Sequence, residues 1–192
     1  HQAIQRATGD VVVFTDATIM LEPDALRNIV SNFHDPSVGC VSCEDALAAG
    51  ARTRTAESLY SRYDMWVRRL ESRVGSVVGL SGFCFAARRH LCLEWPHTLA
   101  SDFFLLLNTV RRGYRGVGDP TTRGYYDTVK SLQQEFRRKS RTILRGMTVF
   151  MHALDLLNPL RYGFFAIQLA SHKLSKWLVP LWLGVALVTN VQ

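Results

Sequence analysis

The sequence predicts an α/β fold, and the strongest indications lie near its start. A continuous apolar run at Val11–Phe14 indicates a strand, and a second apolar run follows at 38–42. Between them, apolar residues repeat at helical spacing after Pro23. Strand, helix and strand in this order form a βαβ unit. We therefore expect a mainly parallel sheet in which Val11–Phe14 is a central strand buried on both faces.

Three further helices are expected downstream. Residues 51–74 have helical spacing with apolar residues on one face, namely Leu59, Tyr63, Trp66 and Leu70. A second helix should begin at Ser101-Asp102 and end at Gly113, because acids favour helix starts and glycine favours helix ends. Residues 128–147 form a basic amphipathic pattern.

The C-terminal part of the chain is apolar. Trp177–Val191 is shorter than the ~20 residues that cross a bilayer. We expect the start of a transmembrane helix there, preceded by an interfacial helix, with a buried core helix as the alternative. Four residues would lie at the membrane interface: Lys173, Lys176, Trp177 and Trp182. This divides the chain into a domain at 1–150 and a membrane segment at 151–192, with the domain on the cytoplasmic face.

Charge is unevenly distributed along the chain. Residues 1–50 carry two basic and seven acidic side chains, whereas residues 51–192 carry 21 basic and nine acidic ones, mostly arginines among the basic. Arginine suits phosphate groups, so phosphate-bearing ligands or anionic lipids are expected partners, and a solvated basic face is the alternative. The arginine runs lack the interleaved aromatic residues of nucleic-acid binders, so no nucleic acid is expected.

The cysteines do not form a metal-binding pattern. Cys40 and Cys43 make one close pair, but Cys84 and Cys92 are too far apart for a second. We expect all of them to be buried and reduced.

Two acids carry the predicted chemistry. Asp16 follows an apolar strand, where a carboxylate can hold a divalent cation that in turn binds a diphosphate. Asp102 is expected at a helix start, which keeps a carboxylate ionised and able to act as a general base. A plain capping role is the alternative for each.

The order of several motifs resembles the membrane-bound family 2 glycosyltransferases, which include cellulose-, chitin- and hyaluronan-synthase-like enzymes. The motifs are GDVVVFTDAT, GLSGFCFAARR, SDFFLLL with RRGYR, and QQEFRRKSR, followed by the apolar tail. The resemblance implies a partial GT-A fold that binds a nucleotide-diphospho-sugar donor with Mg²⁺ or Mn²⁺. The part that holds the nucleobase would lie upstream of His1, so we expect the chain to be a fragment that is inactive alone.

The resemblance also implies roles for individual residues. Asp16 matches the first metal-binding acid, while Thr18 stands where the second acid is expected. Asp102 matches the catalytic base of an inverting transfer, and its companion acid is replaced by Ser101.

Residues for the acceptor or the diphosphate follow from two other motifs. The acceptor loop falls on Gly79–Gly82 and includes Ser81 and Gly82, with Arg88 or Arg89 behind it. The Gln-x-x-Arg-Trp motif falls on Gln134 and Arg137, with Arg138 in place of the tryptophan. The acceptor would be a saccharide or lipid-linked, and the protein would contact membrane lipids.

Two other functions fit parts of the sequence. A phosphatase with Asp16 as nucleophile needs a downstream lysine and a close acid pair, and Gly118-Asp119-Pro120 offers one acid only. A membrane-anchored glycosyltransferase-like scaffold without catalysis would explain Thr18 and Ser101.

Overall fold

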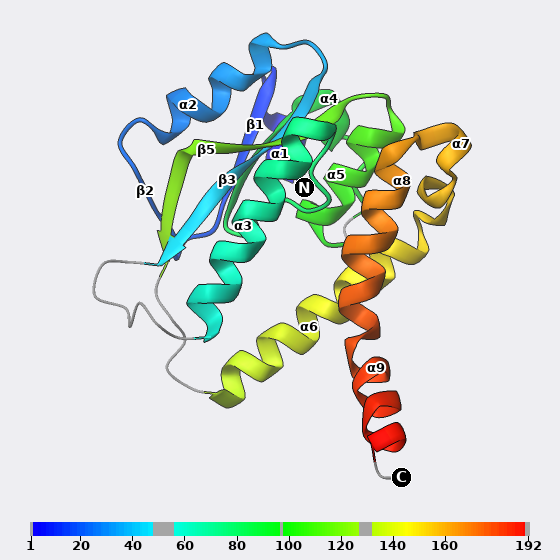
Figure 1. Ribbon diagram of the computed structural model, residues 1–192. Helices are drawn as coiled ribbons and strands as arrows, with labels where there is room; N and C mark the ends of the chain where they lie inside the picture. Colours follow the sequence, from blue (N-terminus) through cyan, green and yellow to red (C-terminus); the bar gives the residue numbers. More distant parts are fainter. Residues whose placement is uncertain (1, 48–55, 97, 127–131, 191–192) are drawn as a thin grey trace.

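The computed structural model describes residues 2–47, 56–96, 98–126 and 132–190. Its centre is a five-stranded sheet of order β1-β4-β3-β5-β2 (Figure 1). The strands are listed in chain order as β1 Val11–Thr15, β2 Met20–Leu21, β3 Val38–Leu47, β4 Cys84–Arg88 and β5 Arg115–Tyr126. Parts of three predicted helices, at 51–55, 128–131 and Val191, lie outside the described residues.

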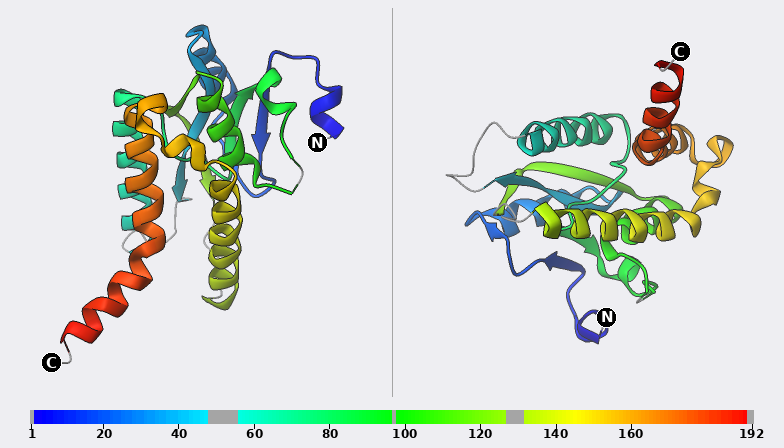
Figure 2. Two further views of the ribbon diagram at one scale, coloured as in Figure 1. Left: turned by 90° about the vertical axis from the view of Figure 1, so that its right-hand side faces the viewer. Right: turned by 90° about the horizontal axis from the view of Figure 1, so that it is seen from below.

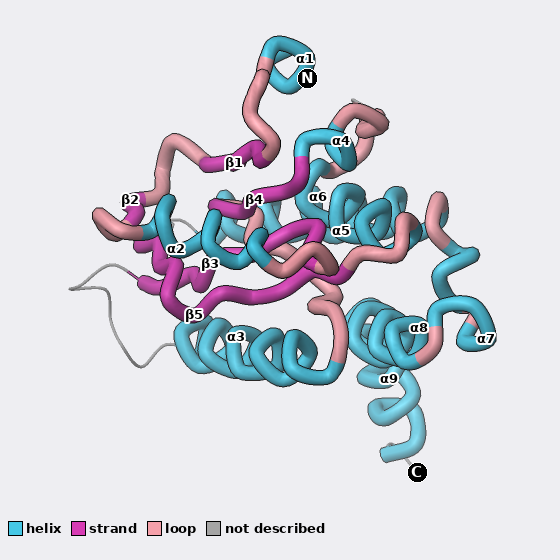
Figure 3. The backbone as a smooth tube through the Cα atoms, turned by 90° about the horizontal axis from the view of Figure 1, so that it is seen from above, coloured by secondary structure: helices cyan, strands magenta, loops and turns pink. Residues whose placement is uncertain are grey.

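The expectation of a mainly parallel sheet with a central first strand is wrong. Only β3 and β5 pair in parallel, whereas β1 and β3 both pair antiparallel with β4, which lies between them. β1 is an edge strand of the described sheet, and Val11–Phe14 are half-buried (Figure 3). Its side chains still contact the core on both faces, because alternate residues of a strand point to opposite sides.

The helices follow the predicted order. The first part of the chain forms α1 Gln2–Arg6, α2 Ala25–Ser31, η1 Asn32–His34, α3 Ala56–Val74, α4 Arg89–Cys92 and α5 Ser101–Arg111. The remainder forms α6 Leu132–Met151, η2 Leu154–Leu157, α7 Pro159–Tyr162, α8 Phe164–Leu169, η3 Ala170–Leu174 and α9 Ser175–Asn190. The predicted start of α5 at Ser101 is confirmed, and Gly113 follows its end with a φ of 82°, a conformation that glycine adopts without strain.

Two helices cover opposite faces of the sheet. Ile29 of α2 packs with Val41 and Val117 on one face, while Leu106 of α5 packs with Cys40 on the other. Figure 2 shows α2 and α3 on opposite sides of β3 and β5. A Cβ atom on Gly116 would lie 2.5 Å from Leu106, so this position of β5 requires glycine for α5 to approach.

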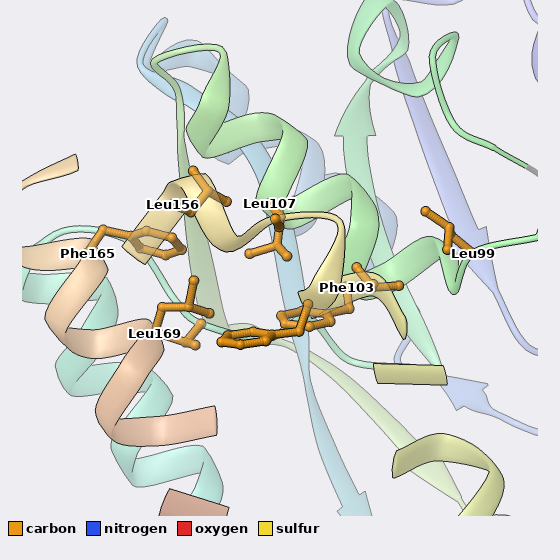
Figure 4. Close-up of a cluster of buried hydrophobic side chains, with 10 residues drawn as sticks. Leu99, Phe103, Leu107, Leu156, Phe165 and Leu169 are labelled. Atoms are coloured by element: carbon orange, nitrogen blue, oxygen red, sulfur yellow. The ribbon is translucent and has the colours of Figure 1, made fainter. Parts of the chain in front are cut away.

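The C-terminal segment packs against α5 in a cluster of buried side chains (Figure 4). Phe103 and Leu107 of α5 contact residues from α6, η2 and α8, including Leu156, Phe165 and Leu169. Burial of these side chains fixes α8 and η3 beside the N-terminal end of α5. The division at residue 150 stays a prediction.

No helix in the described residues is long and apolar enough to cross a membrane, so the expected transmembrane helix is not supported. Nor do three of the predicted interface residues face outward. Lys176 pairs with Asp64, and Trp177 packs against Phe150 with ring centroids 5.1 Å apart. Lys173 lies over the Phe103 ring. Only Trp182 is exposed, at 59%.

All four cysteines are free and buried, as we expected from the sequence. Burial raises the pKa of Cys40 and of Cys92 to about 12, so both remain protonated thiols at neutral pH.

Candidate active site

Asp16 lies immediately beyond the C-terminal end of β1. Its backbone N–H donates to the Phe83 carbonyl over 2.8 Å, which extends the pairing of β1 with β4 by one residue. Its exposed carboxylate accepts hydrogen bonds at Oδ1 from both the backbone and the hydroxyl of Thr18, each 3.1 Å long. Thr18 therefore orients the carboxylate of Asp16. A second acid was expected at position 18, and the threonine there contributes these hydrogen bonds instead.

Ser81 holds the predicted acceptor loop in place. Its hydroxyl donates to Asp45 Oδ1 over 2.5 Å and accepts from the backbone N–H groups of Phe83 and Cys84. Its own N–H donates to the Ser42 hydroxyl over 2.7 Å. The side chain is fully buried and shapes the loop through these hydrogen bonds, and ligand contact by Ser81 and by its neighbour Gly82 stays a prediction.

Asp45, beneath this loop, was not identified from the sequence. Desolvation raises the pKa of its carboxyl, while the charge of Arg68 and the hydrogen bond from Ser81 act in the opposite direction. It lies within β3, beyond the run at 38–42 whose pattern indicates only an apolar strand, so no sequence signal marked it.

Gly82 brings the loop to Asp102. A Cβ atom on Gly82 would lie 3.9 Å from Asp102 Oδ2, so the Asp102 carboxylate stands directly beside the glycine backbone. Asp102 occupies the first turn of α5 and is half-buried. Its carboxylate forms no hydrogen bond or ion pair with any residue that the structure describes, so it is available to a ligand.

Two contacts and one step along the chain connect the two predicted acids at one edge of the sheet. Asp16 bonds to Phe83, Phe83 follows Gly82, and Gly82 adjoins Asp102. The structure thus brings together residues that are 86 positions apart in the sequence.

The residues predicted on α6 lie in its first half, which projects beyond the sheet (Figure 2). Gln134 and Arg137 are exposed and Arg138 is half-buried. The Arg137 guanidinium forms no ion pair with the described part of the chain and can meet a ligand or solvent. Contact of these three side chains with a substrate stays a prediction. Arg88, predicted behind the acceptor loop, donates to the carbonyls of Val38, Phe33 and Asp35. It therefore holds the segment that leads into the N-terminal end of β3.

A cluster of charges that the sequence did not reveal joins α3 to the C-terminal helices. Asp64 of α3 accepts from Lys176 over 2.7 Å and pairs with Arg68 over 3.2 Å. His172 Nδ1 lies 2.5 Å from Glu71, whose other oxygen accepts the N–H of Val78. The buried side of α3 is therefore the charged one.

Apolar residues of α3 face outward instead. Leu59, Tyr63 and Trp66 are each more than half exposed. Of these three, Tyr63 lines an open groove of about 570 Å³ between α3 and the C-terminal helices, together with Tyr60, Leu70, Phe164, Lys176 and others.

Within the described residues there is no group of three or more His, Cys, Asp or Glu side chains that could bind a metal ion. A metal at Asp16 would therefore not be held by three such side chains of the described residues, and oxygens of a ligand or of water could complete its coordination. Mg²⁺ is commonly held in this way, by one or two carboxylates together with substrate phosphates and water.

The fold is that of the GT-A type nucleotide-sugar glycosyltransferases, as two solved structures show. The mannosyltransferase PcManGT from Pyrobaculum calidifontis, in complex with GDP-Man and Mn²⁺, is 20% identical with a TM-score of 0.60, and the match covers 99% of this chain and 57% of that one. The glucosyl-3-phosphoglycerate synthase from Mycobacterium tuberculosis, in complex with Mn²⁺, UDP-Glc and phosphoglyceric acid, is 18% identical with a TM-score of 0.51; the match covers 77% of this chain and 52% of that one.

The chain thus spans little more than half the length of these structures. No protein-family model matches the sequence, and a search of curated proteins gives no match. The Mn²⁺ in both neighbours agrees with the Mg²⁺ or Mn²⁺ expected from the sequence.

Proposed function

We propose that this chain is part of an enzyme that transfers a sugar from a nucleotide-diphospho-sugar donor to a saccharide or lipid-linked acceptor. The observation that carries the proposal is the meeting of Asp16, Gly82 and Asp102 at one edge of a GT-A type sheet. Because the order of the sequence motifs resembles that of glycosyltransferase family 2, membership of this family is part of the proposal.

Asp102 acts as the general base in this proposal. Its half-buried carboxylate has no hydrogen-bonding partner in the described chain and stands beside Gly82, where an acceptor hydroxyl can approach. It would take the proton of that hydroxyl as the oxygen attacks the anomeric carbon from the side opposite the departing diphosphate. Such a displacement inverts the configuration at that carbon.

Asp16 would hold Mg²⁺ or Mn²⁺ together with the phosphates of the donor. A divalent cation bound there neutralises charge on the diphosphate that leaves. The contribution of Thr18 is to fix the Asp16 carboxylate through the two hydrogen bonds to Oδ1. Arg137, with Gln134 and Arg138 on the same helix, would add positive charge or polar contacts near the diphosphate, or near lipid headgroups in the case of Arg138.

The test is the Asp102→Asn variant of the full-length protein. Removal of a positioned base slows transfer by ~10²–10⁴ and leaves donor binding near that of the wild type. The control is Asp24→Asn, which changes another acid at a helix start, one that is exposed and pairs with Arg27. Transfer at the wild-type rate by Asp102→Asn would remove the general-base role.

A catalytically inactive scaffold is the second candidate. The observation in its favour is that position 18, where the family pattern has a second acid, holds a threonine whose hydroxyl donates a hydrogen bond to Asp16 Oδ1. In that case the wild type binds a nucleotide sugar without transferring it, and Asp102→Asn changes nothing. Measured transfer by the wild type excludes it.

We also propose that the protein associates with membrane lipids. Support comes from α9, whose exposed apolar residues are Leu178, Val179, Leu181, Trp182, Leu183, Val185, Leu187 and Val188. Location on the cytoplasmic face stays a prediction, since Lys173 and Lys176, on which it relied, are turned toward the domain.

A further inference from the structure

Lys173 directs its ammonium group at the predicted acceptor loop. It belongs to η3, a short π-helical turn of the kind often found at functional positions. Its Nζ lies 3.0 Å from the point where a Cβ atom on Gly79 would be. The same nitrogen is 4.7 Å from the ring centre of Phe103, the residue that follows Asp102.

The Lys173 ammonium makes no direct ion pair with a described residue, although the carboxylates of Asp64 and Asp102 act on its charge. It forms no hydrogen bond or ion pair within the described ranges of the chain, and its ring contact with Phe103 offers no acceptor oxygen. The cations around it differ in this respect. Arg68 and Lys176 share the carboxylate of Asp64, at 3.2 and 2.7 Å. An ammonium has three donors, so Lys173 has unused capacity to bind an anion.

The electrostatics of this position agree with an incomplete site. Desolvation, reinforced by the positive charges of Arg68 and Lys176, lowers the pKa of Lys173 to about 8. Asp64 and Asp102 attract its proton, but they do not offset the desolvation. An anionic group bound next to the ammonium would restore the charged form, because a nearby opposite charge favours it.

We propose that Lys173 binds an anionic group, a phosphate or a carboxylate, carried by the sugar acceptor. The assignment to the acceptor rests on the proposed function and on the order of contacts along the loop. Asp16 meets the loop at Phe83, Asp102 meets it at Gly82, and Lys173 meets it at Gly79. In this order of loop contacts the base comes between the donor-side acid and the lysine, and we therefore assign Lys173 to the acceptor.

The probe is inorganic phosphate, titrated into the full-length protein without metal or nucleotide. Loss of one charge-assisted contact weakens binding by about tenfold to a hundredfold, which is the expectation for Lys173→Met. Lys173→Arg should retain most of the affinity. The control is Arg161→Met, which removes an exposed positive charge on α7 and should bind phosphate as the wild type does. Equal phosphate affinity in Lys173→Met and the wild type would overturn the proposal.

A second titration separates acceptor from donor. GDP and UDP are added with Mn²⁺, and phosphate is then titrated into the complex. Retained phosphate binding supports the acceptor role, whereas displacement by the nucleotide assigns the lysine to the donor diphosphate and overturns it. A wild type that binds no nucleotide with Mn²⁺ would overturn the proposed function and with it the acceptor role. The phosphate titration would still report whether Lys173 holds an anion.

Discussion

Gly82 leaves the Asp102 carboxylate open on one side, since a Cβ atom on the glycine would lie 3.9 Å from Asp102 Oδ2. This distance is an ordinary van der Waals contact, so a methyl group fits without displacing the acid. It also fills the space through which an acceptor hydroxyl would reach the carboxylate. The size of the side chain at position 82 should therefore control transfer more than folding.

We expect Gly82→Ala to fold with a melting temperature near that of the wild type and to transfer sugar more slowly. Gly82→Val should abolish most transfer, because its branched side chain extends further toward Asp102. Both variants should bind the donor normally. The measurements are thermal unfolding, donor affinity and initial rates. Unchanged rates in Gly82→Val would show that acceptors do not pass this residue.

The second prediction concerns metal binding at Asp16. Thr18 supplies a hydroxyl where the family pattern has an acid, and it already bonds to Asp16 Oδ1. Thr18→Asp should raise the affinity for Mn²⁺ in the presence of a nucleotide diphosphate, because a carboxylate is a better ligand for this ion than a hydroxyl. Asp16→Asn should lower it, while Asp24→Asn serves as an exposed control. Calorimetric titration with Mn²⁺ measures these affinities. Equal affinity in all variants would contradict metal binding at Asp16.

The third prediction is about stability. The Asp64 side chain is 14% exposed and pairs with both Arg68 and Lys176. Asp64→Asn leaves these cations without their counterion, and breaking a buried ion pair in this way costs about 3 kcal/mol. Asp24→Asn breaks only the exposed pair with Arg27, where about 0.5 kcal/mol is the most we expect. Urea unfolding of both variants gives the two free energies. Similar losses in the two would mean that the Asp64 cluster adds no stability.

The fourth prediction follows from His172. Desolvation lowers the pKa of His172, but the interactions with Asp64 and Glu71 outweigh it and raise the pKa above its usual value. A raised pKa in the folded state adds stability that is complete below the unfolded pKa of about 6.5 and is lost as pH rises through the folded value. The difference in unfolding free energy between the wild type and His172→Gln should therefore shrink above that pH. A difference that is constant from pH 6 to 9 would contradict it.

The sequence predicted those parts of the fold that depend on local pattern. The start of α5 at Ser101 and the turn at Gly113 follow from capping chemistry and were placed correctly. The position of β1 in the sheet was predicted wrongly. A continuous apolar run does not distinguish a central strand from an edge strand with both faces partly covered. Pairing partners are set by residues far away in the chain, here those of β4.

The residues of the candidate site also fall into those that the sequence predicts and those that it does not. Asp16 and Asp102 belong to motifs whose order along the chain can be recognised, so they could be predicted from the sequence alone. Asp45 and Lys173 could not, because each depends on a tertiary contact, with Ser81 in one case and with Gly79 in the other. Lysines near an apolar tail favour a membrane interface on sequence alone. In the structure, acids and aromatic rings of α3 and α5 draw Lys173 and Lys176 inward.

The last prediction compares two tryptophans of α9 to test membrane association. Trp177 is half-buried against Phe150, with the rings nearly perpendicular at 88°. Trp182 is 59% exposed and lies among exposed apolar residues. Trp177→Ala should lower the free energy of unfolding by about 2 kcal/mol, since it removes aromatic packing from the core cluster. Trp182→Ala should leave stability unchanged and reduce binding to lipid vesicles, because exposed indole rings favour the membrane–water interface.

The vesicles should be prepared both from neutral lipid and with added anionic lipid, and binding measured by flotation. Loss of binding in Trp182→Ala on both kinds of vesicle indicates that apolar contact by α9 holds the protein to the surface. Binding of the wild type to anionic vesicles alone, unchanged in Trp182→Ala, would instead assign the attraction to charge, for which Arg138 on α6 is the candidate. If the wild type floats with neither, the proposed membrane association is wrong.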